Sequence, residues 1–137
     1  MEPERQAPTI LLVDDDPIVH WVLAQYLGRA GYQTVSTHNG REALESVRRR
    51  APQLILLDVR MDELDGLATL KQLKETEATK AVPVIMMTVN DDWLTKLKSE
   101  TFGAEVFLSK PFSPTELVAQ IERLIGPAHA PGSPLTR

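Results

Sequence analysis

The sequence contains no cysteine, which excludes disulfide bonds and metal sites built from thiolates. It also lacks any apolar run near the ~20 residues that a membrane-spanning helix needs. The first residues, MEPERQAP, carry no apolar core of a signal peptide. Basic residues are outnumbered by acidic ones, 15 to 19, whereas nucleic-acid surfaces are usually basic. We therefore expect a cytoplasmic protein that contacts neither a membrane nor a nucleic acid directly.

The composition favours one globular domain. The 137 residues are 42% hydrophobic and 25% charged, values typical of such a domain. Half of the 10 prolines lie near the two ends, at Pro3, Pro8, Pro127, Pro131 and Pro134. This distribution predicts a flexible N-terminus over 1–8, a folded unit over 9–126, and a Pro-rich disordered tail or linker over 127–137.

Two continuous apolar runs end in aspartate. Residues 9–14 read TILLVD, and residues 54–57 read LILL before Asp58. Apolar residues without alternation are typical of strands that are buried on both faces of a sheet. Shorter segments predict three further strands, over 32–36, 83–88 and 105–108.

Helical patterns separate these strands. Asp16 followed by Pro17 predicts a helix start, and Gly31 a helix end. Further helices are predicted from Asn39 to about Arg50, from about Asp65, over 91–101, and from Ser113 to about 126.

The alternation of strands and helices indicates the fold class. Buried strands joined by helices imply a parallel sheet covered on both faces. Right-handed crossovers then give a doubly wound (βα)5 three-layer sandwich with a five-stranded parallel sheet, of flavodoxin-like type. In such folds the functional site lies beyond the carboxyl ends of the strands.

Polar side chains cluster at these predicted strand ends: Asp14, Asp15, Asp58, Thr88 and Lys110. Two carboxylates about 4 Å apart repel by roughly 4 kcal/mol near a protein surface, so crowded carboxylates need a cation or a proton. Oxygen ligands suit Mg²⁺ or Mn²⁺, and Mg²⁺ commonly also binds a phosphate oxygen. A carboxylate can itself be the nucleophile that forms an aspartyl phosphate. We therefore expect metal-dependent phosphoryl chemistry at this edge.

A series of motifs in this order makes the chain resemble a known family. The motifs are Val13-Asp14-Asp15, LILLD ending at Asp58, Met61, Asp65-Gly66, Thr88 in PVIMMT, Gly103-Ala104 and Lys110-Pro111-Phe112. Asp58 precedes Thr88 by 30 positions, and Thr88 precedes Lys110 by 22. Over residues 9–126 the chain resembles the receiver domain of bacterial two-component response regulators.

The resemblance implies a phosphoryl acceptor. Asp58 would accept a phosphoryl group from a phosphohistidine on a sensor histidine kinase or a histidine phosphotransfer protein. Asp15, Asp58 and the backbone carbonyl of Arg60 would bind Mg²⁺ (or Mn²⁺) directly, and Asp14 through water. Thr88 and Lys110 would contact the phosphoryl oxygens.

The resemblance also implies a switch that is not an enzyme for an external substrate, although it catalyses its own phosphorylation and dephosphorylation. Phe107 would turn inward when Thr88 moves toward the phosphoryl group. The face formed by the segments 91–101, 105–108 and 113–126 would report the change to an output domain or downstream protein. A phosphorylation-dependent dimer is left open.

Two positions depart from the family pattern. Asp62 stands where proline is usual, which predicts a less rigid and more acidic loop after the third strand. Val89 stands where a small residue is usual, and its branched side chain is expected to narrow access to the phosphoryl group.

Simpler interpretations remain for single residues. The three aspartates could cap the next helix, although Asp16 alone suffices for that role. Phe107 could be plain core. His20, His38 and His129 show no mutual spacing typical of metal binding and are interpreted as structural or surface residues.

Three other functions remain open. A pseudo-receiver would act as a phosphorylation-independent interaction module, although such modules typically lack one of the acidic residues or the lysine. A Mg²⁺-dependent phosphohydrolase commonly has a second aspartate two residues after the nucleophile, where this chain has Arg60. A flavodoxin-like flavin binder would need hydroxyl and amide donors where this chain has three carboxylates.

Overall fold

The computed structural model describes residues 7–60, 65–89 and 93–128. The strands are β1 (Thr9–Val13), β2 (Gln33–Thr37), β3 (Leu54–Asp58), β4 (Val84–Thr88) and β5 (Val106–Ser109). The helices are α1 (Pro17–Arg29), α2 (Gly40–Arg49), α3 (Gly66–Glu75), α4 (Trp93–Thr101) and α5 (Pro114–Ile125). The predicted alternation of five strands with five helices is confirmed. No helix in these ranges is long and apolar enough to cross a membrane.

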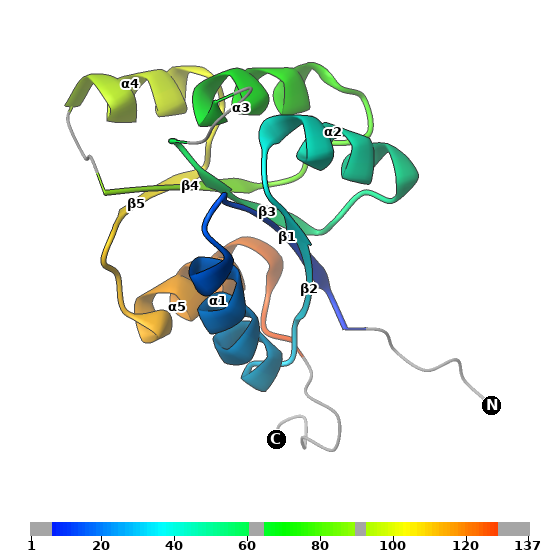
Figure 1. Cartoon of the computed structure of the whole chain (residues 1–137), viewed down its shortest axis with the longest axis vertical. Helices are drawn as coiled ribbons and strands as arrows, with labels where there is room; N and C mark the ends of the chain where they lie inside the picture. The colour runs from blue at the N-terminus through cyan, green and yellow to red at the C-terminus, as the bar shows by residue number, and fades with distance from the viewer. Residues whose placement is uncertain (1–6, 61–64, 90–92, 129–137) are drawn as a thin grey trace.

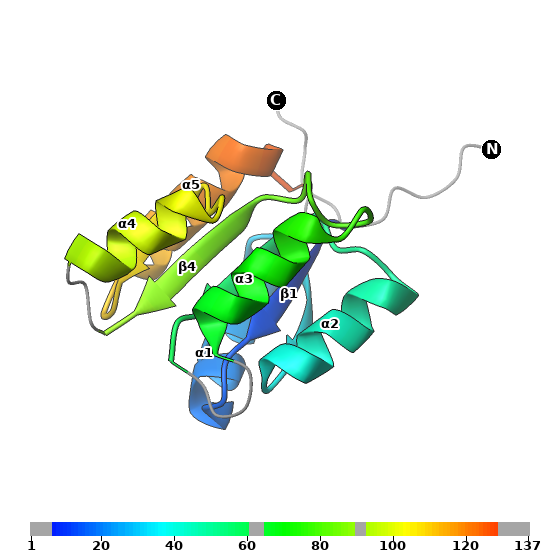
Figure 2. The ribbon, with the colours of Figure 1, turned by 90° about the horizontal axis from the view of Figure 1, so that it is seen from above.

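The strands form one parallel sheet in the order β2-β1-β3-β4-β5. Helices α1 and α5 cover one face, and α2, α3 and α4 lie side by side over the other (Figures 1 and 2). The apolar runs of β1, β3 and β4 are buried throughout because side chains alternate between two covered faces. The doubly wound three-layer sandwich is therefore confirmed.

Each face of the sheet has its own apolar core. On the α1/α5 face, Leu12 and Leu56 pack with Leu27 and Ile121. On the other face, Leu11, Val13 and Leu57 pack with apolar residues of α2 and α3. The central strands thus contribute alternate residues to both cores, which fixes the point at which each strand ends.

Local signals set the helix ends as the sequence predicts. Asp16, Asn39, Asp65 and Ser113 each cap a helix by accepting a main-chain N–H of its first turn. Gly31 follows α1 with a φ of 97°, a left-handed conformation that suits glycine. These caps place the helix starts just beyond the carboxyl ends of the strands.

Strand β2 is one residue later than predicted, at 33–37 instead of 32–36. Tyr32 instead donates its main-chain N–H to the Leu27 carbonyl, and its hydroxyl to the Gly126 carbonyl at 3.2 Å. The buried Tyr32 ring therefore joins α1 to the end of α5, and pairing with β1 begins at Gln33. Boundaries of the predicted N-terminus and tail stay predictions, because residues 1–6 and 129–137 lie outside the described residues.

Replacing Leu56 by alanine tests the two-sided burial of β3. Leu56 is fully buried on the α1/α5 face, so Leu56→Ala is expected to lower the free energy of unfolding by about 2–5 kcal/mol. The measurement is urea unfolding followed by circular dichroism. Leu94→Ala, at an exposed site on α4, is the control and should change stability by less than about 0.5 kcal/mol. Equal effects of the two variants would contradict the described core.

Candidate functional site

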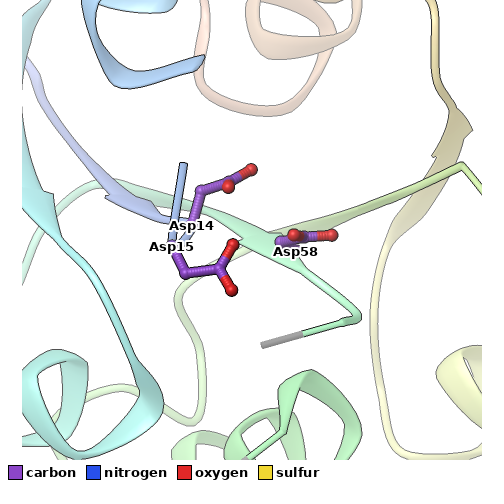
Figure 3. A group of neighbouring side chains, drawn as sticks. All are labelled: Asp14, Asp15 and Asp58. Atoms are coloured by element: carbon purple, nitrogen blue, oxygen red, sulfur yellow. The ribbon is translucent and has the colours of Figure 1, made fainter. Parts of the chain in front are cut away.

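Three aspartates meet at the carboxyl edge of the sheet. Val13 pairs with Leu57, so Asp14, the next residue after β1, lies beside Asp58 at the end of β3. One carboxylate oxygen from each of Asp14, Asp15 and Asp58 lies within 4.8 Å of the others. Figure 3 shows the three side chains gathered where β1 and β3 end. The predicted convergence of these carboxylates is confirmed, and its donor set fits a hard divalent cation.

Both the side chain and the main chain of Asp14 form hydrogen bonds. Its Oδ1 accepts the main-chain N–H of Asp16 at 2.9 Å, and its Oδ2 accepts Lys110 Nζ at 2.9 Å. Its main-chain N–H donates to the Thr37 carbonyl at 3.2 Å, and its carbonyl accepts Nε2 of His20 at 2.6 Å. Both carboxylate oxygens of this buried residue therefore already have a donor.

Lys110 joins two strand ends. Its ammonium lies 2.9 Å from Asp14 Oδ2 and 3.8 Å from Asp58 Oδ2. Its main-chain N–H donates to the carbonyl of Thr88 at 2.7 Å, which fixes the end of β5 against the end of β4. The Lys110 ammonium thus lies near two of the three carboxylates, and a carboxylate cluster of this kind attracts cations.

The surroundings of Asp58 raise the pKa of its carboxyl group. Burial, followed by repulsion from Asp14, raises the pKa of Asp58 to about 6. Lys110 opposes this rise, as does the main-chain N–H of Arg60, which donates to Asp58 Oδ1 at 3.4 Å. At neutral pH the carboxyl is still mostly ionised, at about ten to one. Asp58 is thus a buried, poorly solvated carboxylate, a suitable state for a nucleophile.

The loop after β3 folds tightly against Asp58. A Cβ on Gly66 would collide with the carbonyl oxygen of Asp58 and lie 2.6 Å from the Cα of Val59. Gly66 also donates its main-chain N–H to the Val59 carbonyl at 2.9 Å. Glycine is therefore required where the start of α3 crosses the strand end. Met61 and Asp62, with the loop character predicted from Asp62, lie outside the described residues.

The remaining predicted residues lie around this centre. Thr88 ends β4, is fully buried, and stands one strand from Asp58. Arg60 is exposed in the loop that follows β3. Phe107 is partly buried against the α2/α3 core and also lines a hollow of about 340 Å³ between α4 and α5. Phe107 is therefore neither plain core nor free surface.

Two histidines lie close together, one buried and one exposed, in line with their interpretation as structural or surface residues. The rings of His20, on α1, and His38, after β2, have centroids 4.7 Å apart. Their spacing in the sequence does not indicate this proximity, because the pairing of β1 with β2 brings together residues that are distant in sequence. His38 directly follows β2, and His20 lies on the helix that follows the adjacent strand β1. His129 lies outside the described residues.

The comparisons with known proteins agree on one family. A family model described as the response regulator receiver domain matches residues 10–122. The DNA-binding transcriptional regulator NtrC of Escherichia coli K12 is 39% identical over 120 residues, which is 88% of this chain and 25% of NtrC. The chain spans between 25% and 51% of the length of such curated relatives.

Solved structures show the same fold. The receiver domain of a signal transduction histidine kinase from Syntrophus aciditrophicus has a TM-score of 0.82 and 34% identity, covering 96% of each chain. The receiver domain of a sensor histidine kinase from Pseudomonas aeruginosa PAO1 has a TM-score of 0.81 and 31% identity, covering 87% of this chain and 98% of that one. That structure has a magnesium ion coordinated in its active site cleft.

Replacing Asp58 by asparagine tests whether the buried, ionised Asp58 carboxylate destabilises the fold. The folded-state pKa of about 6 exceeds the ordinary value of 3.8, so the stability contributed by protonated Asp58 is lost as the pH rises through 6. Asp58→Asn is therefore expected to be more stable than the wild type at pH 8 without metal, by about 1–3 kcal/mol. The advantage should shrink below about pH 5.

Urea unfolding in EDTA between pH 4 and 8 measures this difference. Glu45→Gln, which removes an exposed charge on α2, controls for net charge. An Asp58→Asn protein less stable than the wild type across this range would contradict the strained carboxylate.

Proposed function

This chain belongs to the family of response regulator receiver domains, and on that premise we propose that Asp58 accepts a phosphoryl group from a phosphohistidine partner. The observation that carries the proposal is the setting of Asp58: buried, beside Asp14 and Asp15, and 3.8 Å from Lys110. The partner would be a sensor histidine kinase or a histidine phosphotransfer protein in a cytoplasmic phosphorelay.

The acidic cluster would hold Mg²⁺ or Mn²⁺. Asp15, Asp58 and the backbone carbonyl of Arg60 are proposed as direct ligands, with Asp14 acting through water. The two donors already on the Asp14 carboxylate support this division, because they leave Asp14 less able to bind a metal directly. When bound, the metal supplies positive charge that stabilises the transferring phosphoryl group.

Transfer would then proceed by in-line displacement. A carboxylate oxygen of Asp58 attacks phosphorus, the phosphorus–nitrogen bond of the phosphohistidine breaks, and the imidazole leaves with the bonding electron pair and takes up a proton. The hydroxyl of Thr88 and the ammonium of Lys110 share the charge on the phosphoryl oxygens. The hydrogen bond from Lys110 to the Thr88 carbonyl keeps these two residues at the same edge.

The phosphoryl group would change the α4–β5–α5 face. Thr88 moves toward the phosphoryl oxygens and Phe107 turns inward, which is a two-state change biased by local charge. The hollow that Phe107 lines separates α4 from α5, and Trp93, Leu94 and Leu97 are exposed on α4. We propose that an output domain or downstream protein reads this face; a phosphorylation-dependent dimer would use the same surface.

Phosphotransfer profiling tests the acceptor. Incubation with a panel of radiolabelled histidine kinases and Mg²⁺ is expected to label the wild-type chain, because Asp58 is the nucleophile. Asp58→Asn should lose at least ~99% of the label, as should omission of the metal.

Further controls distinguish a receiver that is phosphorylated on Asp58 from a pseudo-receiver that acts without phosphorylation. Binding of beryllium fluoride with Mg²⁺, followed by the fluorescence of Trp93, reports the site without a kinase; Trp21→Phe isolates that signal. Label that persists in Asp58→Asn would refute the acceptor. A wild-type chain that takes neither label nor beryllium fluoride would be a phosphorylation-independent pseudo-receiver.

Val89 gives a separate prediction about the lifetime of the phosphoryl group. Val89 lies at the end of β4, 65% exposed, and lines the same groove as Lys110. Its branches are expected to hinder attacking water, so Val89→Ala should shorten the aspartyl-phosphate lifetime by about two- to tenfold, equivalent to ~0.4–1.4 kcal/mol in the barrier. Label decay after kinase removal measures this, and an unchanged or longer lifetime in Val89→Ala would disprove it.

A further inference from the structure

Two histidine rings lie next to each other beside the acidic cluster. His20 is in the second turn of α1, and His38 is the first residue after β2. The hydrogen bond from the Asp14 N–H to the Thr37 carbonyl continues the β1–β2 pairing and brings these segments together. The ring centroids are 4.7 Å apart, with planes tilted by 52°.

His20 has one nitrogen engaged and one without a partner. Its Nε2 lies 2.6 Å from the carbonyl oxygen of Asp14, which can only accept, so Nε2 carries the hydrogen. In the neutral ring Nδ1 then has a free lone pair. Nδ1 is buried and has no hydrogen-bond partner in the described part of the chain, and the residue is only 6% exposed. Such an unsatisfied buried nitrogen is uncommon and needs an explanation.

His38 has a matching arrangement. Its Nδ1 lies 3.4 Å from Oε1 of Glu42, and the same oxygen accepts the His38 main-chain N–H at 2.8 Å. With Nδ1 directed at this carboxylate, Nε2 is the nitrogen that can offer a lone pair. The His38 side chain is 52% exposed, so its ring has room to turn without disturbing the core.

Each histidine thus has one ring nitrogen oriented by an oxygen. A histidine that binds a metal almost always donates its other ring N–H to a carboxylate, a backbone carbonyl or water. Here the Asp14 carbonyl serves His20, and the Glu42 carboxylate serves His38. Imidazole nitrogens suit Zn²⁺, Ni²⁺ and Cu²⁺, whereas Mg²⁺ prefers oxygen ligands.

We propose that His20 Nδ1 and His38 Nε2 bind one late first-row divalent cation such as Zn²⁺, with water completing the coordination. This is a second cation site, distinct from the carboxylate cluster in its ligands and in the metals it selects. It spans α1 and the segment after β2. The lone pair of His20 then has a partner, which the packing of the two rings alone does not supply.

Zinc titration in the presence of saturating Mg²⁺ tests the site, because Mg²⁺ occupies the carboxylates. Isothermal titration of the full chain with Zn²⁺ is expected to show one site per chain. His38→Ala should weaken that site by about tenfold or more, and His20→Asn, checked for folding by circular dichroism, should do the same. Glu45→Gln and His129→Ala, which remove an exposed carboxylate of α2 and the third histidine, should leave the affinity unchanged.

Nitrogen-15 NMR signals of the histidine rings give an independent test of which nitrogens bind Zn²⁺. Zn²⁺ is expected to shift the ring nitrogens of His20 and His38 and to leave those of His129 in place. A zinc affinity that survives His38→Ala, or imidazole signals that do not move, would each overturn the site. Asp58→Asn should still bind Zn²⁺, so failure of the phosphoryl acceptor and failure of the zinc site are separate results.

Discussion

The ion pair between Lys110 and Asp14 holds the carboxyl edge of the sheet together. Parallel strands in register bring their ends to one line, and in this chain those ends carry Asp14, Asp58 and Thr88. Without a cation between them the carboxylates would repel one another. Lys110 reaches back from β5 to within 2.9 Å of Asp14 and 3.8 Å of Asp58. Its position in turn depends on the hydrogen bond to the Thr88 carbonyl.

The ammonium of Lys110 compensates only part of the negative charge of the three aspartates. The pKa of Asp58 therefore stays raised. Burial and Asp14 disfavour the ionised form of Asp58 more than Lys110 and the Arg60 N–H favour it. Burial is imposed by the core on both faces of the sheet, which fixes the end of β3 deep in the structure. The fold therefore creates the strain at Asp58, and a bound cation would relieve it.

Much of the fold was predictable because its signals are local. Apolar runs such as LILL, and caps such as Asp16 and Ser113, depend on neighbours in sequence, and they correctly placed β3 and the starts of α1 and α5. The convergence of Asp14, Asp15 and Asp58 followed from a general rule about parallel sheets. The shifted start of β2 did not follow, because it depends on the long-range contact of Tyr32 with Gly126.

The same distinction explains what the sequence left hidden at the site. Carboxylates at strand ends are visible in the sequence, but the hydrogen-bond partners of Asp14 are not. The Asp16 N–H and the side chains of His20 and Lys110 donate to Asp14. The Thr37 carbonyl, at the end of β2, accepts the Asp14 N–H. His20 and His38 lie close together because their segments meet at Asp14, and no spacing in the sequence indicates this contact. His20 therefore matters in two ways: its Nε2 donates to the main-chain carbonyl of Asp14, and its buried Nδ1 has no hydrogen-bond partner among the described residues. A ligand at His20 Nδ1 that changed the hydrogen bond from Nε2 to Asp14 would also change the affinity of the acidic cluster for a cation. By linkage, a cation in that cluster would then change the affinity at His20 by the same factor.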